Sequence, residues 1–137
     1  MFRFFKSVKP IAISGVMLIC LGSASWADGG LVTRTELHRV PAGVDSTHEV
    51  IVSRLEVQPG GTIPRHSHLG IELLTVVSGG QMQAGTGQVI DFPTGAVVQF
   101  PEGAVHGGLT NIADTPLVAI TTHVVDVGEP LNLLVAD

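Results

Sequence analysis

The stretch that decides the fold runs from Gly60 to Gly79 and reads GGTIPRHSHLGIELLTVVSG. Within it His66 and His68 are two residues apart, and residues at this spacing on an extended chain point to the same face. Glu72 follows on the next apolar segment, after Gly70, which allows the chain to bend. The pattern therefore predicts that two imidazoles and one carboxylate converge, and such a donor set suits a divalent cation.

A further histidine can complete this donor set. His106 follows the tight turn at residues 101–103, at the edge of an expected strand, where its side chain can face inward. Several buried imidazoles and a carboxylate are costly in an apolar β-protein unless they are paired or bound to a metal. We therefore expect one divalent metal to be held by His66, His68, Glu72 and His106.

Short segments rich in Val, Ile and Thr surround this stretch, and turns that contain Pro, Gly or Asn separate them. The expected strands are Leu31–Val40, Thr47–Gln58, Glu72–Val77, Gln81–Ala84, Gln88–Phe92, Val97–Phe100 and Leu117–Val125. No apolar repeat of 3.6 residues is long enough to favour a helix. The sequence thus predicts an all-β sandwich or barrel.

The N-terminus has the layout of a secretory signal peptide over residues 1–27. Three basic residues precede the apolar run Ile11–Leu21, which is shorter than the roughly 20 residues that a membrane-spanning helix needs. An uncleaved anchor and a lipoprotein modified at Cys20 are the less favoured alternatives. We expect cleavage after Ala27, a periplasmic or secreted product, and a single domain over residues 28–137.

The composition of the expected mature chain excludes several kinds of chemistry. Its four basic and 12 acidic residues give a net charge of −8 with histidine neutral, so nucleic acid and anionic membranes are not expected partners. All lysines and the only cysteine lie in the expected signal segment. The mature chain therefore has no residue for a Schiff base, a thiol nucleophile or a disulfide.

Two spaced motifs cover the chain from Gly60 to Asn111. The first, G-x5-H-x-H-x3-E-x6-G, is met by Gly60, His66, His68, Glu72 and Gly79. The second, G-x5-P-x-G-x2-H-x3-N, is met by Gly95, Pro101, Gly103 and His106, whereas Thr110 stands at the last position and Asn111 follows it. These motifs resemble those of the cupin superfamily. The resemblance implies a jelly-roll β-barrel (a double-stranded β-helix), often dimeric, with the metal inside one mouth.

Four protein ligands leave an octahedral metal two positions for water, substrate or dioxygen. The leading hypothesis is a metal-dependent enzyme of the oxygenase type that acts on an enol, a phenol or an oxo acid. The resemblance also allows a decarboxylase, an isomerase or a lyase, with Glu72 as a possible acid or base besides its role as a ligand. The alternative is a non-catalytic module that binds or senses a metal or a small ligand.

The metal can be Fe, Mn, Ni, Cu or Zn, and outside the cytoplasm the order of affinities favours Cu, Ni or Zn. A homodimer and a small-molecule ligand are the expected partners. Further pocket candidates are Gln83, Gln99 and His123, although an outward polar position is the simpler interpretation of each. His38 and His48 have no motif around them and are expected at the surface.

Overall fold

The computed structural model describes residues 30–44 and 46–136, and within these ranges it contains strands and turns but no helix. The strands are β1 (Val32–Pro41), β2 (His48–Val57), β3 (Thr62–Ile63), β4 (His66–Ser67), β5 (Gly70–Ser78), β6 (Gly80–Ala84), β7 (Val89–Phe92), β8 (Val97–Phe100), β9 (Leu109–Asn111), β10 (Leu117–Asp126) and β11 (Leu133–Leu134). No described segment forms a helix long and apolar enough to cross a membrane. The expected signal peptide and its cleavage after Ala27 lie outside the described residues.

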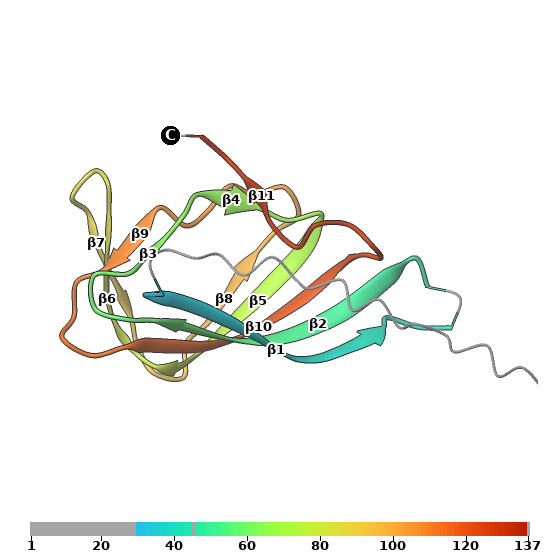
Figure 1. Cartoon of the computed structure of the whole chain (residues 1–137), viewed down its shortest axis with the longest axis horizontal. Helices are drawn as coiled ribbons and strands as arrows, with labels where there is room; N and C mark the ends of the chain where they lie inside the picture. The colour runs from blue at the N-terminus through green and yellow to red at the C-terminus, as the bar shows by residue number, and fades with distance from the viewer. Residues whose placement is uncertain (1–29, 45, 137) are drawn as a thin grey trace, which may run out of the picture.

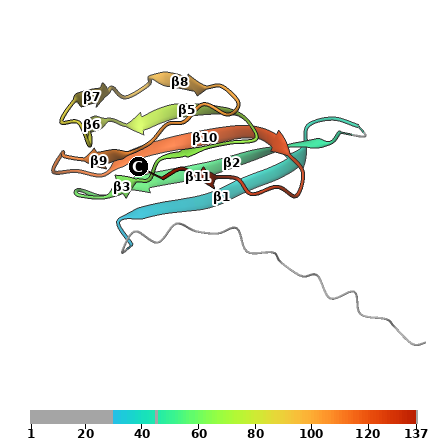
Figure 2. The same ribbon diagram turned by 90° about the horizontal axis from the view of Figure 1, so that it is seen from above.

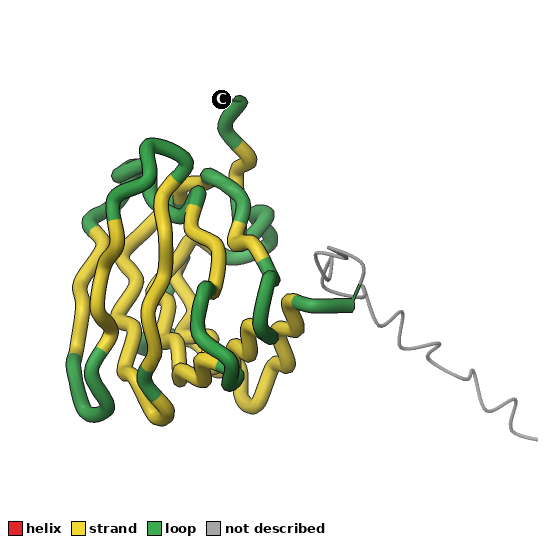
Figure 3. The backbone as a smooth tube through the Cα atoms, turned by 90° about the vertical axis from the view of Figure 1, so that its left-hand side faces the viewer, coloured by secondary structure: helices red, strands yellow, loops and turns green. Residues whose placement is uncertain are grey.

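The strands form two larger antiparallel sheets and one small one. The first sheet has the order β1-β2-β10-β5-β8, the second β3-β9-β6-β7, and β11 pairs with β4. Figure 2 shows the five strands of the first sheet in this order, and Figure 1 shows β11 beside β4 near the C-terminus. Most strands run roughly along one direction, with loops gathered at the two ends (Figure 3). This arrangement confirms the expected all-β fold.

The core lies between the sheets because alternate residues of the long strands point inward. In β10 every second side chain from Leu117 to Val125 is buried. In β2 the odd-numbered residues from Glu49 to Val57 are buried, and they share one face of that strand. The buried hydrophobic cluster comprises Val32, Leu55, Val57, Ile63, Leu74, Val76, Met82, Leu117 and Ala119. Aliphatic side chains fill most of this core, as the scarcity of aromatic residues requires.

All seven expected strands are present, with ends that differ by at most two residues. The four short strands β3, β4, β9 and β11 were not expected, because two or three residues carry no periodic signal and pair only through tertiary contacts. Gly70 begins β5 with a φ of 146°, and a Cβ there would lie 1.9 Å from the carbonyl oxygen of Val124. The close approach of β10 thus requires glycine at the bend before Glu72.

Candidate metal centre

The structure brings His66, His68, Glu72 and His106 to one point inside the fold. One ligand atom from each residue lies within 4.8 Å of the others. His66 and His68 come from β4 and its end, Glu72 comes from β5, and His106 follows the turn after β8. The backbones of His66 and His106 exchange two hydrogen bonds of 2.9 Å, which ties the two motifs together at the site.

Each of the three imidazoles is oriented by a backbone carbonyl. The contacts join Nδ1 of His66 to the oxygen of Pro64 at 2.8 Å, Nδ1 of His68 to that of Leu131 at 2.5 Å, and Nδ1 of His106 to that of Ala104 at 2.9 Å. Because a carbonyl only accepts hydrogen bonds, each ring carries a proton on Nδ1. The Nε2 atom is then the available ligand, the arrangement usual for histidines that bind metals.

The carboxylate of Glu72 faces two of these Nε2 atoms at short range. Its Oε2 atom lies 2.9 Å from Nε2 of His68 and 3.0 Å from Nε2 of His106. A neutral ring protonated at Nδ1 offers only a lone pair at Nε2, so both sides of each contact are acceptors unless a proton or a cation lies between them. The donor set therefore fits a divalent cation bound by imidazole and carboxylate.

Two neighbours fix the position of His106 and of the ring beside it. Phe100 stacks on the His106 imidazole with a centroid distance of 4.0 Å and an interplanar angle of 9°. Gly107 has a φ of 80°, and a Cβ there would lie 2.3 Å from the carbonyl oxygen of Pro64 and 3.1 Å from Nδ1 of His66. Glycine thus lets the two ligand-bearing segments approach each other.

Asn111, displaced by one position from the motif, has a structural role. Its side chain is buried, and Nδ2 donates to the carbonyl oxygens of Val57 and Thr115, each at 2.9 Å. Its Oδ1 accepts from the backbone nitrogen of Ala113 at 3.0 Å. The displaced residue therefore holds the connection between β9 and β10, and His106 keeps its place in the site.

His123 occupies the inward position, which was the less simple interpretation of the sequence. It is fully buried on β10, with Nε2 3.5 Å from Oε1 of Glu72, and its ring centroid lies 4.6 Å from that of His68. The alternation of β10 puts it on the same face as the buried Thr121 and Val125. An isolated histidine in a β-branched strand gave no signal that distinguishes the two faces.

Arg34 was not predicted as a site residue. It lies on β1, where its partly buried side chain reaches into the fold and donates from Nη1 to Oγ1 of Thr121 at 2.7 Å. Together with His66, Glu72 and His106 it lines an internal cavity of about 40 Å³. The residues on either side of Arg34 are polar. The only sequence signal for an inward side chain is that Arg34 lies two residues after Val32, which is buried.

The other pocket candidates lie away from this cavity. Gln99 is exposed on β8, because Val98 and Phe100 take the inward positions. Gln83 donates from Nε2 to the carbonyl oxygen of Gly87 in the hairpin between β6 and β7, at 3.3 Å. The structure therefore assigns neither amide to the site.

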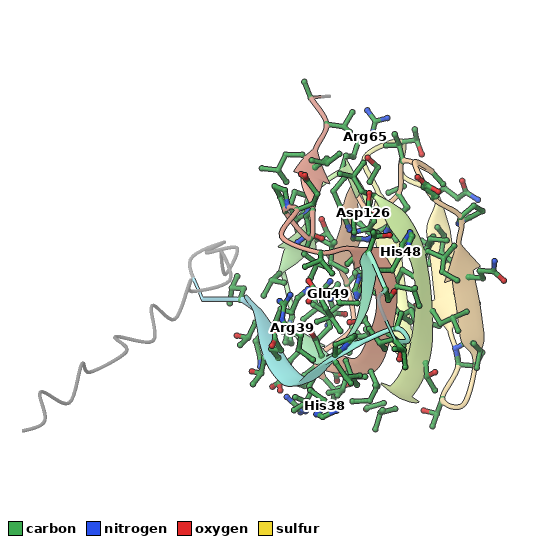
Figure 4. All side chains as sticks on the ribbon, turned by 90° about the vertical axis from the view of Figure 1, so that its right-hand side faces the viewer. His38, Arg39, His48, Glu49, Arg65 and Asp126 are labelled. Atoms are coloured by element: carbon green, nitrogen blue, oxygen red, sulfur yellow. The ribbon has the colours of Figure 1, made fainter. Side chains whose placement is uncertain are left out.

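The other two histidines are exposed, as expected. His38 lies on β1, and Nε2 of His48 on β2 lies 3.2 Å from Oδ1 of Asp126. Figure 4 labels both residues, together with Arg39 and Glu49 of the same two strands. Neither histidine is a neighbour of the candidate metal centre.

Burial and charge shift the pKa values of the central groups. Burial, aided by the neighbouring His106 and His68, lowers the pKa of His66 to about 4, and burial likewise lowers the pKa of His123 to about 3. Burial alone would raise the pKa of Glu72, but its short contacts with Nε2 of His106 and His68, which stabilise the carboxylate when a proton or a cation lies between the atoms, hold that pKa well below its usual range. At neutral pH the site therefore offers a carboxylate beside neutral rings of His66 and His123.

Comparison with known proteins is consistent with this geometry. Residues 53–123 match the cupin domain family, and no curated protein matches the chain. A conserved protein from Klebsiella pneumoniae with a double-stranded β-helix domain is 21% identical, with a TM-score of 0.60 over 82% of this chain and 91% of that chain. The polyketide cyclase RemF from Streptomyces resistomycificus is 16% identical, with a TM-score of 0.56 over 79% of this chain and 75% of its own. A DMSP lyase from Ruegeria pomeroyi is 18% identical, with a TM-score of 0.58 over 82% and 56%. At these identities the likeness shows the fold.

Proposed function

The chain belongs to the cupin family, and from this premise we propose that it is a mononuclear metal-dependent enzyme acting on a small molecule. His66, His68, Glu72 and His106 would hold the metal. The observation that carries the proposal is the set of three Nδ1 contacts to backbone carbonyls, which leave Nε2 of each ring as a ligand atom, in a cluster with the Glu72 carboxylate whose ligand atoms lie within 4.8 Å of one another. Histidine ligands of metal sites are oriented by such hydrogen bonds from the other ring nitrogen, whereas a core held only by hydrogen bonds does not need this arrangement.

The metal would supply Lewis acidity and a binding position for an oxygen of the substrate. The protein itself orients the ligands and restricts access of water, since three of the four ligand side chains are buried. Glu72 remains ionised throughout the neutral range because its pKa is lowered. It is therefore suited to balance the charge of a cation and, in its ligand role, to accept a proton only under acidic conditions.

For the reaction, we propose oxygenase-type chemistry on an enol, a phenol or an oxo acid. The support is the ligand set, which leaves positions open on an octahedral metal, and the absence of Lys and Cys nucleophiles from residues 28–137. Proteins of similar fold include a polyketide cyclase, a DMSP lyase and an oxalate oxidase, so cyclase, lyase and oxidase activities occur on this fold.

The proposal is tested by metal content and oxygen consumption in matched variants. His106→Gln removes one ligand, whereas His48→Gln changes an exposed histidine outside the site. We expect the wild type and His48→Gln to retain about one metal per chain and to consume oxygen with at least one member of a panel of enols, phenols and oxo acids. His106→Gln should lose both properties. A wild type that binds metal but consumes no oxygen with any metal and substrate would contradict the oxygenase function.

A non-catalytic binding or sensing role is the second candidate. It is favoured by the small volume of the cavity, about 40 Å³, which leaves little space for a large substrate. A metal or ligand that raises the unfolding temperature without turnover would support it. For either role we propose export after removal of residues 1–27 and a homodimer, which N-terminal sequencing of the natural product and sedimentation equilibrium would test.

A further inference from the structure

We propose that Arg34 is the anchor for the carboxylate of the ligand, so that the site takes a short-chain carboxylic acid bearing an enol or oxo oxygen. This inference rests on the proposed metal function and narrows its substrate class. Arg34 would bind the carboxylate, and the metal held by His66, His68, Glu72 and His106 would bind the second oxygen.

The lining of the cavity combines a few charged or polar side chains with many apolar ones. Arg34 shares the cavity with three of the four ligand residues, His66, Glu72 and His106, while the rest of the wall is mainly apolar. The apolar residues include Leu55, Leu74, Met82, Phe92, Phe100 and Leu117. Among the described residues that line it, Arg34 carries the only permanent positive charge. A ligand here therefore meets an ionic contact at one place and hydrocarbon at most others.

Arg34 is held in position from the same strand that backs the metal centre. Its Nη1 atom donates to Oγ1 of Thr121 at 2.7 Å, and Thr121 is fully buried on β10. Two residues later on the same face, His123 lies 3.5 Å from Oε1 of Glu72. A guanidinium has five N–H donors, so one that the contact with Thr121 holds in place at the cavity wall can bind a carboxylate with little further ordering.

The charge of the loaded site also favours an anion. Glu72 and Arg34 cancel each other's formal charge, and imidazoles that bind a cation through the Nε2 lone pair contribute no charge of their own. A bound divalent cation would thus leave the interior with a net positive charge. In a partly buried cavity such a charge is weakly screened, so an anionic ligand is preferred over a neutral one of the same shape.

The size of the cavity selects among the candidate substrates. A volume of about 40 Å³ has room for roughly three water-sized groups, at 10–15 Å³ for each. Both kinds of ligand need more space than this volume gives, but a short oxo or enol acid requires less movement of the walls than a phenol or a fused ring. The cavity therefore favours the oxo acid over the phenol among the proposed substrates.

The test compares pyruvate with pyruvamide, its neutral analogue of nearly equal size, by calorimetric titration of zinc-loaded protein. Arg34→Gln removes the anchor, and Arg54→Gln is the matched control because Arg54 is exposed on β2 and contacts Glu56. Zinc content is measured in every sample before the ligand is added. We expect the wild type and Arg54→Gln to bind pyruvate about 10- to 100-fold more tightly than pyruvamide, the usual range for a charged hydrogen bond.

With Arg34→Gln the preference should fall below about threefold at unchanged zinc content, which would support the anchor. An unchanged preference in this variant, or no preference in the wild type, would overturn it. If the variant does not fold, ¹⁵N spectra of the arginine side chains of the wild type replace it as the test. A shift of the Arg34 Nε signal on addition of pyruvate, but not of pyruvamide, supports the anchor. No shift with pyruvate overturns it.

The zinc measurement distinguishes failure of the proposed metal function from failure of the Arg34 anchor. A wild type without bound zinc would contradict the metal centre before any ligand is present. The ¹⁵N signal of Arg34 Nε is then followed in the metal-free protein. A shift with pyruvate but not with pyruvamide supports the anchor, and no shift with pyruvate overturns it.

Discussion

Replacement of Gly107 by alanine should damage the metal centre although it replaces none of the ligands. The new Cβ would lie 2.3 Å from the carbonyl oxygen of Pro64, whereas contacts below 3.0 Å essentially never occur for a Cβ atom. The carbonyl must therefore withdraw by about 0.7 Å, and it is the acceptor that orients the His66 ring. Gly87→Ala is the matched control, because its φ of 89° is similar and no atom lies within 4 Å of the added Cβ.

The two substitutions share one cost and differ in another. A left-handed φ costs an alanine about 1 kcal/mol at either position. Gly107→Ala adds the weakened hydrogen bond between Pro64 and His66, about 1 kcal/mol, and the strain of overpacking, about 1 kcal/mol or more. We therefore expect a loss of about 3 kcal/mol in the free energy of unfolding for Gly107→Ala and about 1 kcal/mol for Gly87→Ala.

The assay is urea unfolding of the metal-free proteins, followed by competitive zinc titration of the folded ones. Loss of an orienting contact typically weakens metal affinity 10- to 100-fold, so Gly107→Ala should show this loss and Gly87→Ala should not. Equal stabilities and equal zinc affinities of the two variants would refute the claim that the close approach of Gly107 to Pro64 shapes the site.

Three further predictions follow from the same contacts. Because the folded state lowers the pKa of His66 to about 4 and that of His123 to about 3, the unfolded chain binds more protons below pH 6.5. The metal-free protein should therefore lose stability as the pH falls from about 6.5 to about 3, and thermal unfolding at pH 7.5 and 4.5 would show a lower midpoint at pH 4.5; an equal or higher one would contradict the shifts. Truncation before Leu131 removes the carbonyl that holds the His68 ring, so zinc affinity should fall about 10-fold in a competition titration, and an unchanged affinity would exclude that role. Asn111→Ala removes three hydrogen bonds in the interior and should lower the free energy of unfolding by about 2–4 kcal/mol, whereas a loss below 1 kcal/mol in denaturant titration would contradict its structural role.

Those features of the fold that depend on local pattern could be predicted from the sequence. Period-two alternation in segments such as Leu117–Val125 identifies the long strands. The spacing of His66, His68 and Glu72 predicts that their three side chains converge. That His106 joins them required the second motif, because no local property of that residue shows which face it takes. The structure brings all four ligand atoms together.

Features that depend on tertiary contacts could not be predicted. Arg34 is inward only because β1 pairs with β2 in a register that sets it opposite Leu55. The carbonyl of Leu131 reaches His68 because β11 pairs with β4. These two residues are 63 positions apart in the sequence. Gln99 is outward because Phe100 takes the inward position beside His106. Each of these outcomes is decided by which strands become neighbours.

The central claim is that one metal ion lies between the Nε2 atoms of His66, His68 and His106 and the carboxylate of Glu72. Anomalous diffraction from crystals of the zinc-loaded protein, recorded on both sides of the zinc absorption edge, tests it most directly. The account predicts one strong peak at this point, about 2.0–2.2 Å from the three nitrogens and a carboxylate oxygen. A peak elsewhere, or none at this point in protein carrying one zinc per chain, would contradict it.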